Sequence, residues 1–153
     1  MAITIQSNYA EGYARGVPGM IGNGEKSNRI SRTVEDAAGI AFGKAAFRGV
    51  GDHGVTATPA AGTFMGITIL DRGIVPVTVS GAVDVYPQYS TAGLLNEGPI
   101  CVLVGVNVAD GDAVFVTSAG VFTNVSTSNI AIPAVFDETV ASGGICMLRV
   151  RRS

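Results

Sequence analysis

The sequence predicts an all-β fold, a small β-barrel or β-tulip-like module with an extended N-terminal arm. Short runs rich in valine, isoleucine and threonine recur about every ten residues from residue 39 onward, which is the spacing of short strands. Glycine, with 21 residues, is spread through the chain and supplies tight turns. The first 38 residues instead show no sustained period of 2 or 3.6. We therefore assign residues 1–38 to the arm and residues 39–153 to one β-barrel domain.

The first half of the predicted domain contains four candidate strands. Residues 39–49 form a run of small and apolar residues, and residues 63–70 (TFMGITIL) are rich in β-branched and apolar side chains. Residues 74–80 place valines at alternate positions, and residues 81–87 continue that alternation. Alternation of this kind predicts strands with one buried face.

Residues 99–108 give the strongest strand signal. Alternate positions from Ile100 to Val108 are all isoleucine or valine, while Cys101 and Leu103 lie on the opposite face. Apolar residues on both faces predict a strand that is buried on both sides. Turn signals at Asp110-Gly111 and Ala119-Gly120 follow, so we expect a three-stranded meander of residues 99–108, 112–118 and 120–125.

The last two predicted strands are residues 130–138 and 144–151. Proline cannot donate a backbone hydrogen bond, so Pro133 predicts that residues 130–138 form an edge strand. The cysteines, Cys101 and Cys146, both lie in apolar strand-like runs, where we expect buried thiols.

The composition indicates a protein that is covered by neighbours. Charged residues make up 14% of the chain, against about 25% in typical soluble domains. The longest apolar run, residues 100–108, is too short for a spanning helix, and the N-terminus lacks the pattern of a signal peptide. The net charge of −2 gives no strong attraction to nucleic acid or to anionic membranes. We expect a soluble, oligomeric protein made in the cytoplasm, with neither nucleic acid nor a membrane as partner.

Three stretches resemble chemical sites, and each is better interpreted as a turn. In residues 19–27 (GMIGNGEKS), Glu25 separates the last glycine from the lysine that a phosphate loop requires next to it. Asp52 and His53 are neighbours, so their side chains point apart in an extended chain. Asp110 and Asp112 are followed by apolar residues and not by further oxygen ligands. We therefore expect no enzyme activity, no cofactor and no metal.

Three stretches of the chain share a recognisable pattern. They are VADGDAVFVTSAGVFTNV (residues 108–125) and IPAVFDETVASGGICMLRVR (residues 132–151), preceded by SRTVEDAAGIAFGKAAFRG (residues 31–49). In combination they resemble the capsid cement, or head-decoration, proteins of tailed bacteriophages. The resemblance covers roughly residues 29–151 and is sharpest over residues 99–151. The resemblance implies a virion structural protein that sits as a homotrimer on the outer capsid surface and clamps neighbouring major capsid proteins.

The N-terminal arm carries the residues that we expect to contact the capsid. Tyrosine and arginine are favoured anchors at interfaces, and apolar residues surround them here. The predicted contact residues are Tyr9, Tyr13, Arg15, Val17, Pro18, Met20 and Ile21. Deletion of residues 1–22 is accordingly expected to abolish capsid binding and to leave a folded trimer.

Two other functions fit the same observations. Another virion component, from the tail or the minor head proteins, would share the low charge and the arm. A non-catalytic β binding module would share the strands, but the absence of tryptophan argues against sugar stacking.

Overall fold

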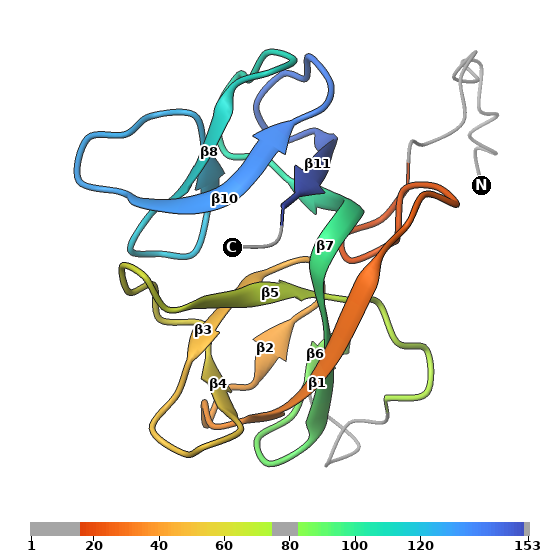
Figure 1. Ribbon diagram of the computed structural model, residues 1–153, viewed down its shortest axis with the longest axis vertical. Helices are drawn as coiled ribbons and strands as arrows, with labels where there is room; N and C mark the ends of the chain where they lie inside the picture. Colours follow the sequence, from red (N-terminus) through yellow and green to blue (C-terminus); the bar gives the residue numbers. More distant parts are fainter. Residues whose placement is uncertain (1–15, 75–82, 152–153) are drawn as a thin grey trace, which may run out of the picture.

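The computed structural model describes residues 16–74 and 83–151, and these residues form only strands, turns and loops (Figure 1). The strands are β1 (Asn28–Val34), β2 (Ile40–Ala41), β3 (Ala45–Arg48), β4 (Gly54–Thr56), β5 (Phe64–Thr68), β6 (Val85–Tyr86), β7 (Thr91–Leu103), β8 (Ala113–Val116), β9 (Phe122–Thr123), β10 (Ile130–Phe136) and β11 (Ile145–Val150). Nine of them form one sheet in the order β1-β4-β3-β5-β7-β11-β10-β8-β9, and β2 pairs with β6. The predicted all-β fold is confirmed.

The lower half of Figure 1 is a closed five-stranded barrel, here called the first barrel. Its strands follow the order β1-β4-β3-β5-β7, and β1 closes the ring by pairing antiparallel with the first part of β7. The interior is filled by a cluster of buried side chains that includes Val34, Val55 and Leu94. The β2–β6 pair adds Tyr86, whose hydroxyl donates to the carbonyl of Ile69 at 2.7 Å.

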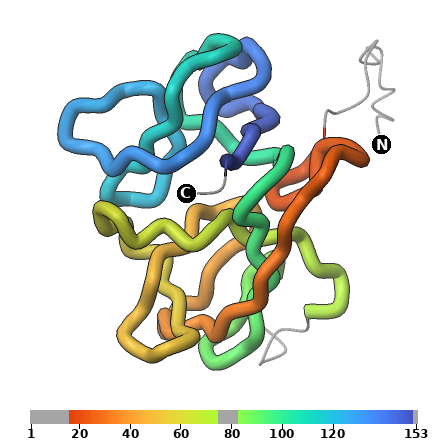
Figure 2. The backbone as a smooth tube through the Cα atoms, viewed as in Figure 1, coloured from red at the N-terminus to blue at the C-terminus, as the bar shows by residue number. Residues whose placement is uncertain are grey.

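The upper half is a second lobe, built from β8 to β11 and the last part of β7 (Figure 2). Its sheet curls until Phe122 of β9 forms a parallel bridge with Val104, immediately after β7. The amide of Gly105 donates to the carbonyl of Phe122 at 3.1 Å, and this hydrogen bond stabilises the contact between β9 and the residues that follow β7. The core of this lobe extends down to Phe47 and Ile67 of the first barrel, so one hydrophobic cluster joins the two halves.

Strand β7 belongs to both halves and bends between them. Gly98 has a φ of 122°, a conformation that favours glycine, and Pro99 follows it. Before the bend, β7 pairs with β1 and β5, and after the bend it pairs with β11. Residues 100–102 are fully or nearly fully buried, as their apolar pattern predicted, and Ile100 and Val102 belong to the core of the second lobe.

The predicted meander is wrong, although its turns are correct. The Asp110-Gly111 turn is closed by the Asp112 amide on the Ala109 carbonyl, and the Ala119-Gly120 turn joins the β8–β9 hairpin. However, β11 and β10 lie between β7 and β8 in the sheet. The turn after β7 therefore sends the chain across the lobe, and the last two strands fill the space between.

The edge position predicted from Pro133 is also wrong. Strand β10 lies between β8 and β11, and its pairing with β8 shifts register between Ala131 and Val135. Pro133 lies within this register shift. The regular hydrogen-bond pattern between the strands is interrupted there, so the missing N–H of proline removes no regular inter-strand hydrogen bond. Its carbonyl still accepts the Arg151 amide at 2.7 Å.

Three parts of the first barrel differ from the predicted strands. Residues 39–49 are divided into β2 and β3 by a turn at Gly43, and residues 81–87 contribute only β6. The predicted strand at residues 74–80 lies almost wholly outside the described residues. Residues 28–34 form β1, so the barrel includes residues that the sequence pattern assigned to the arm.

Candidate interaction surface

Residues 17–22 lie along the second half of β7, on the side opposite β11. The Gly19 amide donates to the Cys101 carbonyl at 2.8 Å, and the Cys101 amide donates to the Met20 carbonyl at 2.8 Å. The Gly22 amide donates to the Pro99 carbonyl at 3.0 Å, and Ile21 bridges Ile100 in antiparallel register. This segment therefore protects an edge of β7 that would otherwise be open.

Gly19 allows the segment to approach the barrel closely. Its φ is 84°, and a Cβ atom there would lie 2.7 Å from the Leu70 amide nitrogen. The Gly19 carbonyl accepts that same amide at 2.8 Å. Residues 19–22 are thus part of the folded sheet, so the deletion of residues 1–22 considered above would also remove structural hydrogen bonds.

An exposed apolar groove begins where this segment reaches the barrel. Exposed large hydrophobic residues line it, with exposed fractions of 48% for Val17, 48% for Leu103 and 72% for Val83. Pro18 lies in its wall, and the cavity measures about 520 Å³. Neighbouring exposed apolar side chains of this kind indicate a surface that another protein covers.

The predicted contact residues fall into three groups. Tyr9, Tyr13 and Arg15 lie outside the described residues. Val17 and Pro18 line the groove. Ile21 packs against the core of the second lobe, and Met20 is half-buried with its backbone bonded to Val17 and Cys101.

Leu103 belongs to the groove but was not among the predicted contact residues. The signal was present in the alternation of residues 99–108, which places Cys101 and Leu103 on the same face. Segment 17–22 covers Cys101, and burial together with the nearby charge of Glu138 raises the pKa of its thiol. Leu103 lines the groove with Val17 and Pro18 and stays 48% exposed.

Both cysteines are buried thiols, as predicted. Cys101 is registered opposite Met147, and Cys146 is registered opposite Val102. Neighbouring positions of a strand point to opposite faces, so the two sulfur atoms lie on different faces of the sheet.

The three stretches that resembled chemical sites are turns with structural roles. Asp112 accepts bonds from the Asn124 side chain at 2.7 Å and the Ala109 amide at 3.0 Å, and these bonds lower the pKa of its carboxyl. His53 is exposed, and its carbonyl accepts the Thr33 amide at 2.9 Å. Glu25 pairs with Arg149.

No metal-binding group of three or more histidine, cysteine, aspartate or glutamate side chains occurs within residues 16–74 and 83–151. Over the same ranges, no helix is long and apolar enough to cross a membrane.

The described chain is all-β and carries an exposed apolar groove beside segment 17–22. The family model described as structural cement protein (E217 gp24/Pam3 gp6) matches residues 5–151, nearly the whole chain. The chain belongs to this phage structural cement protein family, and the resemblance inferred from the sequence is confirmed.

The fold is also similar to that of a solved capsid component. A chain of the structure "The capsid of Myoviridae Phage XM1" superposes with a TM-score of 0.70 over 97% of this chain and 98% of that one, at 17% sequence identity. This likeness supports the fold. None of the curated proteins compared with this sequence matches it.

Proposed function

We propose that this structural cement protein binds the outer surface of a phage head as a homotrimer and bridges neighbouring major capsid proteins. The observation that carries the proposal is the family match over residues 5–151, taken with the exposed groove beside segment 17–22. The cement role follows from the family, whereas the trimer, the outer surface and the identity of the contacted protein are the proposed parts.

The proposed mechanism is mechanical. A cement protein that binds only the assembled lattice stabilises that lattice by mass action. Binding at several points of one trimer adds avidity, so modest contacts at each groove become strong in combination. We further propose that the chain has no catalytic activity, that it is made in the host cytoplasm, and that it binds neither nucleic acid nor membrane in this role. The description of the family as structural supports the first of these.

The contact surface that we propose combines the groove with residues 1–15. Val17, Leu103 and Val83 offer apolar area that an assembled partner would remove from water, at about 25 cal/mol for each Å² buried. Tyr9, Tyr13 and Arg15 remain proposed anchors, because they precede Val17 at the edge of this groove.

The experiment is cosedimentation of the purified protein with emptied, expanded capsids, after its mass has been measured by light scattering. Deletion of residues 1–15 replaces the earlier deletion, because it leaves the hydrogen bonds of residues 19–22 intact. Leu103→Ser tests the groove, and Val50→Ser is the matched control, since Val50 is fully exposed and does not line the groove.

Both the deletion and Leu103→Ser should reduce capsid binding by about tenfold or more, while Val50→Ser should bind like the wild type. A wild-type protein that is trimeric but never pellets with capsids would overturn the proposed function and favour a tail or binding-module role. Equal binding by Leu103→Ser and wild type would remove the groove from the contact surface.

A further inference from the structure

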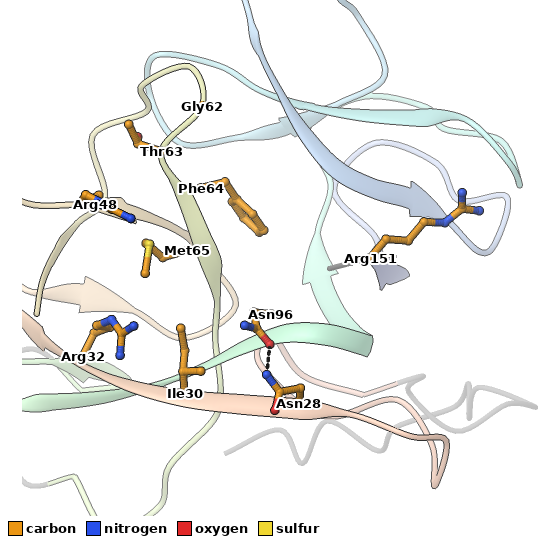
Figure 3. Close-up of a pocket in the computed structure, with 10 residues that line it drawn as sticks. All are labelled: Asn28, Ile30, Arg32, Arg48, Gly62, Thr63, Phe64, Met65, Asn96 and Arg151. Atoms are coloured by element: carbon orange, nitrogen blue, oxygen red, sulfur yellow. Dashed lines mark hydrogen bonds between the residues drawn. The ribbon is translucent and has the colours of Figure 1, made fainter. Parts of the chain in front are cut away.

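The first barrel has an open mouth that is lined by arginines. The mouth is a cavity of about 380 Å³ next to the second lobe, and its wall includes Arg32, Arg48 and Arg151 (Figure 3). Apolar side chains lie between the first two and the third, namely Ile30, Phe64 and Met65. The same cavity contains the side-chain hydrogen bond from Asn28 to Asn96, at 2.6 Å.

Strand geometry shows that Arg32 points into the barrel. Along β1 the residues are alternately half-buried and exposed, so Asn28, Ile30, Arg32 and Val34 share one face. Val34 belongs to the core of the first barrel, and Ile30 packs against that core. Arg32 therefore occupies an inward-facing position between two apolar residues, where a barrel normally places another apolar side chain.

The same argument applies to Arg48 at the end of β3. Ala46 faces the core of the first barrel, whereas Phe47 faces the core of the second lobe. Because side chains alternate along a strand, the Arg48 side chain points to the same side as Ala46. Arg48 lines the mouth together with Arg32. Two strands thus direct a cation toward one cavity.

These arginines have no acidic partner among the described residues. Within residues 16–74 and 83–151, none of Arg32, Arg48 and Arg151 forms an ion pair, and none of the residues lining the cavity is acidic. Among the described residues, the Arg32 guanidinium donates to one acceptor, the Ser31 carbonyl, at 2.8 Å. This local excess of positive charge stands in a chain whose net charge is −2.

We propose that the mouth of the first barrel binds an acidic segment of a neighbouring virion protein, with carboxylates on Arg32 and Arg48 and an apolar side chain over Ile30 and Met65. Arginine suits carboxylates because its planar guanidinium can donate two parallel hydrogen bonds. The apolar floor between the charges favours a polypeptide, whose acidic and apolar side chains alternate over a short distance. A nucleic acid would instead need a basic stripe that follows its backbone, and the negative net charge opposes its approach.

This inference rests on the proposed function only in naming a virion protein as the source of the segment. The groove at Val17 and Leu103 and the mouth at Arg32 and Arg48 have no lining residue in common. Variants of one site therefore leave the other intact, and the two proposals can fail separately.

The test uses the full chain and a capped peptide of sequence Gly-Asp-Leu-Asp-Gly, with Gly-Asn-Leu-Asn-Gly as the neutral probe. Binding is followed by NMR through the side-chain N–H signals of the arginines and the methyl signals of Ile30 and Met65. Arg29→Gln is the matched control, because Arg29 lies on the same strand but on its exposed face.

The acidic peptide should shift the signals of Arg32, Arg48, Ile30 and Met65, and the neutral peptide should not. Arg32→Gln and Arg48→Gln should each weaken binding by about tenfold or more, and Arg32→Lys should restore part of it. Arg29→Gln should stay within about twofold of wild type, and added salt should weaken binding. Thermal unfolding checks that each variant is folded, and the exposed Arg48 keeps the test valid if Arg32→Gln does not fold.

Other outcomes would overturn the inference. Equal shifts from both peptides, equal losses from Arg29→Gln and Arg32→Gln, or stronger binding of inorganic phosphate or a short single-stranded oligonucleotide would each contradict a carboxylate site. Self-association of Arg32→Gln with unchanged peptide binding would show that the inward charges only prevent aggregation. Failure of wild-type protein to bind capsids, with peptide binding intact, would instead count against the proposed function.

Discussion

Arg149 and Arg151 lie two residues apart at the end of the chain, yet their surroundings are opposite. Arg149, in β11, donates to Asp137 at 2.9 Å and also pairs with Glu25, which stands 124 positions away in the sequence. These two carboxylates raise the pKa of the Arg149 guanidinium still further. Arg151 instead lines the mouth of the first barrel and forms no ion pair within the described ranges.

The difference separates charges that hold the fold together from charges that are available to a partner. Arg149 ties the loop before β1 to β11, so its role is completed within the chain. Glu35 is a second example, because its carboxylate accepts the Val50 and Gly51 amides at 2.7 Å each and so organises the β3–β4 loop. Among the described residues, the arginines of the mouth have no comparable carboxylate acceptor.

The largest effect is expected at Glu35 and the glycine that makes room for it. A Cβ atom on Gly54 would lie 1.6 Å from a carboxylate oxygen of Glu35, so Gly54→Ala should displace the carboxylate from its two amides. Gly54→Ala and Glu35→Ala should each lower the free energy of unfolding by about 2 kcal/mol. In the Glu35→Ala background, Gly54→Ala should cost less than about 1 kcal/mol, because the clash is gone. Chemical denaturation of the four proteins measures this coupling.

The matched control for this cycle is Gly24→Ala. Gly24 lies in a loop where a new Cβ atom meets nothing within 4 Å, so the free energy of unfolding should change little. Binding to capsids and to the acidic peptide should remain unchanged in every member of the cycle. Additive losses at Glu35 and Gly54 would show that the cost of Gly54→Ala does not arise from displacing the Glu35 carboxylate.

A smaller effect should separate Arg48 from Arg149. Arg149→Gln removes two ion pairs and should lower the melting temperature modestly, as expected for exposed pairs. Arg48→Gln removes a cation that has no ion pair among the described residues, so the free energy of unfolding should stay within about 0.5 kcal/mol of wild type. Thermal melts at low salt compare the two variants, and an equal loss of stability in both would show that Arg48 stabilises the fold as much as Arg149 does.

The smallest effect is a pH dependence that arises from Glu25. Hydrogen bonds from Arg149, and next from Asn23, lower the pKa of its carboxyl below the ordinary value of 4.5. The unfolded chain therefore binds this proton more readily, so the ion pair stabilises the fold above that value and its contribution is lost as the pH falls through the lowered pKa. Melting temperatures measured across this acidic range should fall less steeply for Glu25→Gln than for wild type. Parallel curves would show that the pair contributes nothing to stability.

The sequence pattern predicted the second lobe better than the first barrel. Residues 99–108, 112–118, 130–138 and 144–151 are runs rich in apolar side chains, and each contains a strand or, for residues 99–108, the end of β7. Strand β1 escaped prediction because Asn28 and Arg32 occupy inward positions, which removes the apolar alternation. Asn28 and Arg32, which interrupt the apolar alternation of β1, also line the mouth of the first barrel.

The contact surface could be predicted only in part, for a related reason. The pattern placed Cys101 and Leu103 on one face of β7, but only the position of segment 17–22 shows that the first is covered and the second is exposed. The same segment directs Ile21 to the core while Val17 stays at the surface. Whether an apolar side chain is core or contact depends on what lies across from it.

By itself the sequence determined the all-β class, the turns at Asp110-Gly111 and Ala119-Gly120, the buried thiols and the cement protein family, because these follow from local periodicity, turn chemistry and motif. Only the tertiary structure decided which strands are neighbours, that β10 is internal despite Pro133, and where the groove and the arginine-lined mouth lie. Strand pairing joins residues far apart in the chain, as β1 and β7 do, and no local pattern specifies such a partner. The role of a charge likewise depends on the fold. Arg149 is structural because the fold places the Glu25 carboxylate beside it, whereas Arg48 lines the mouth, where none of the lining residues is acidic.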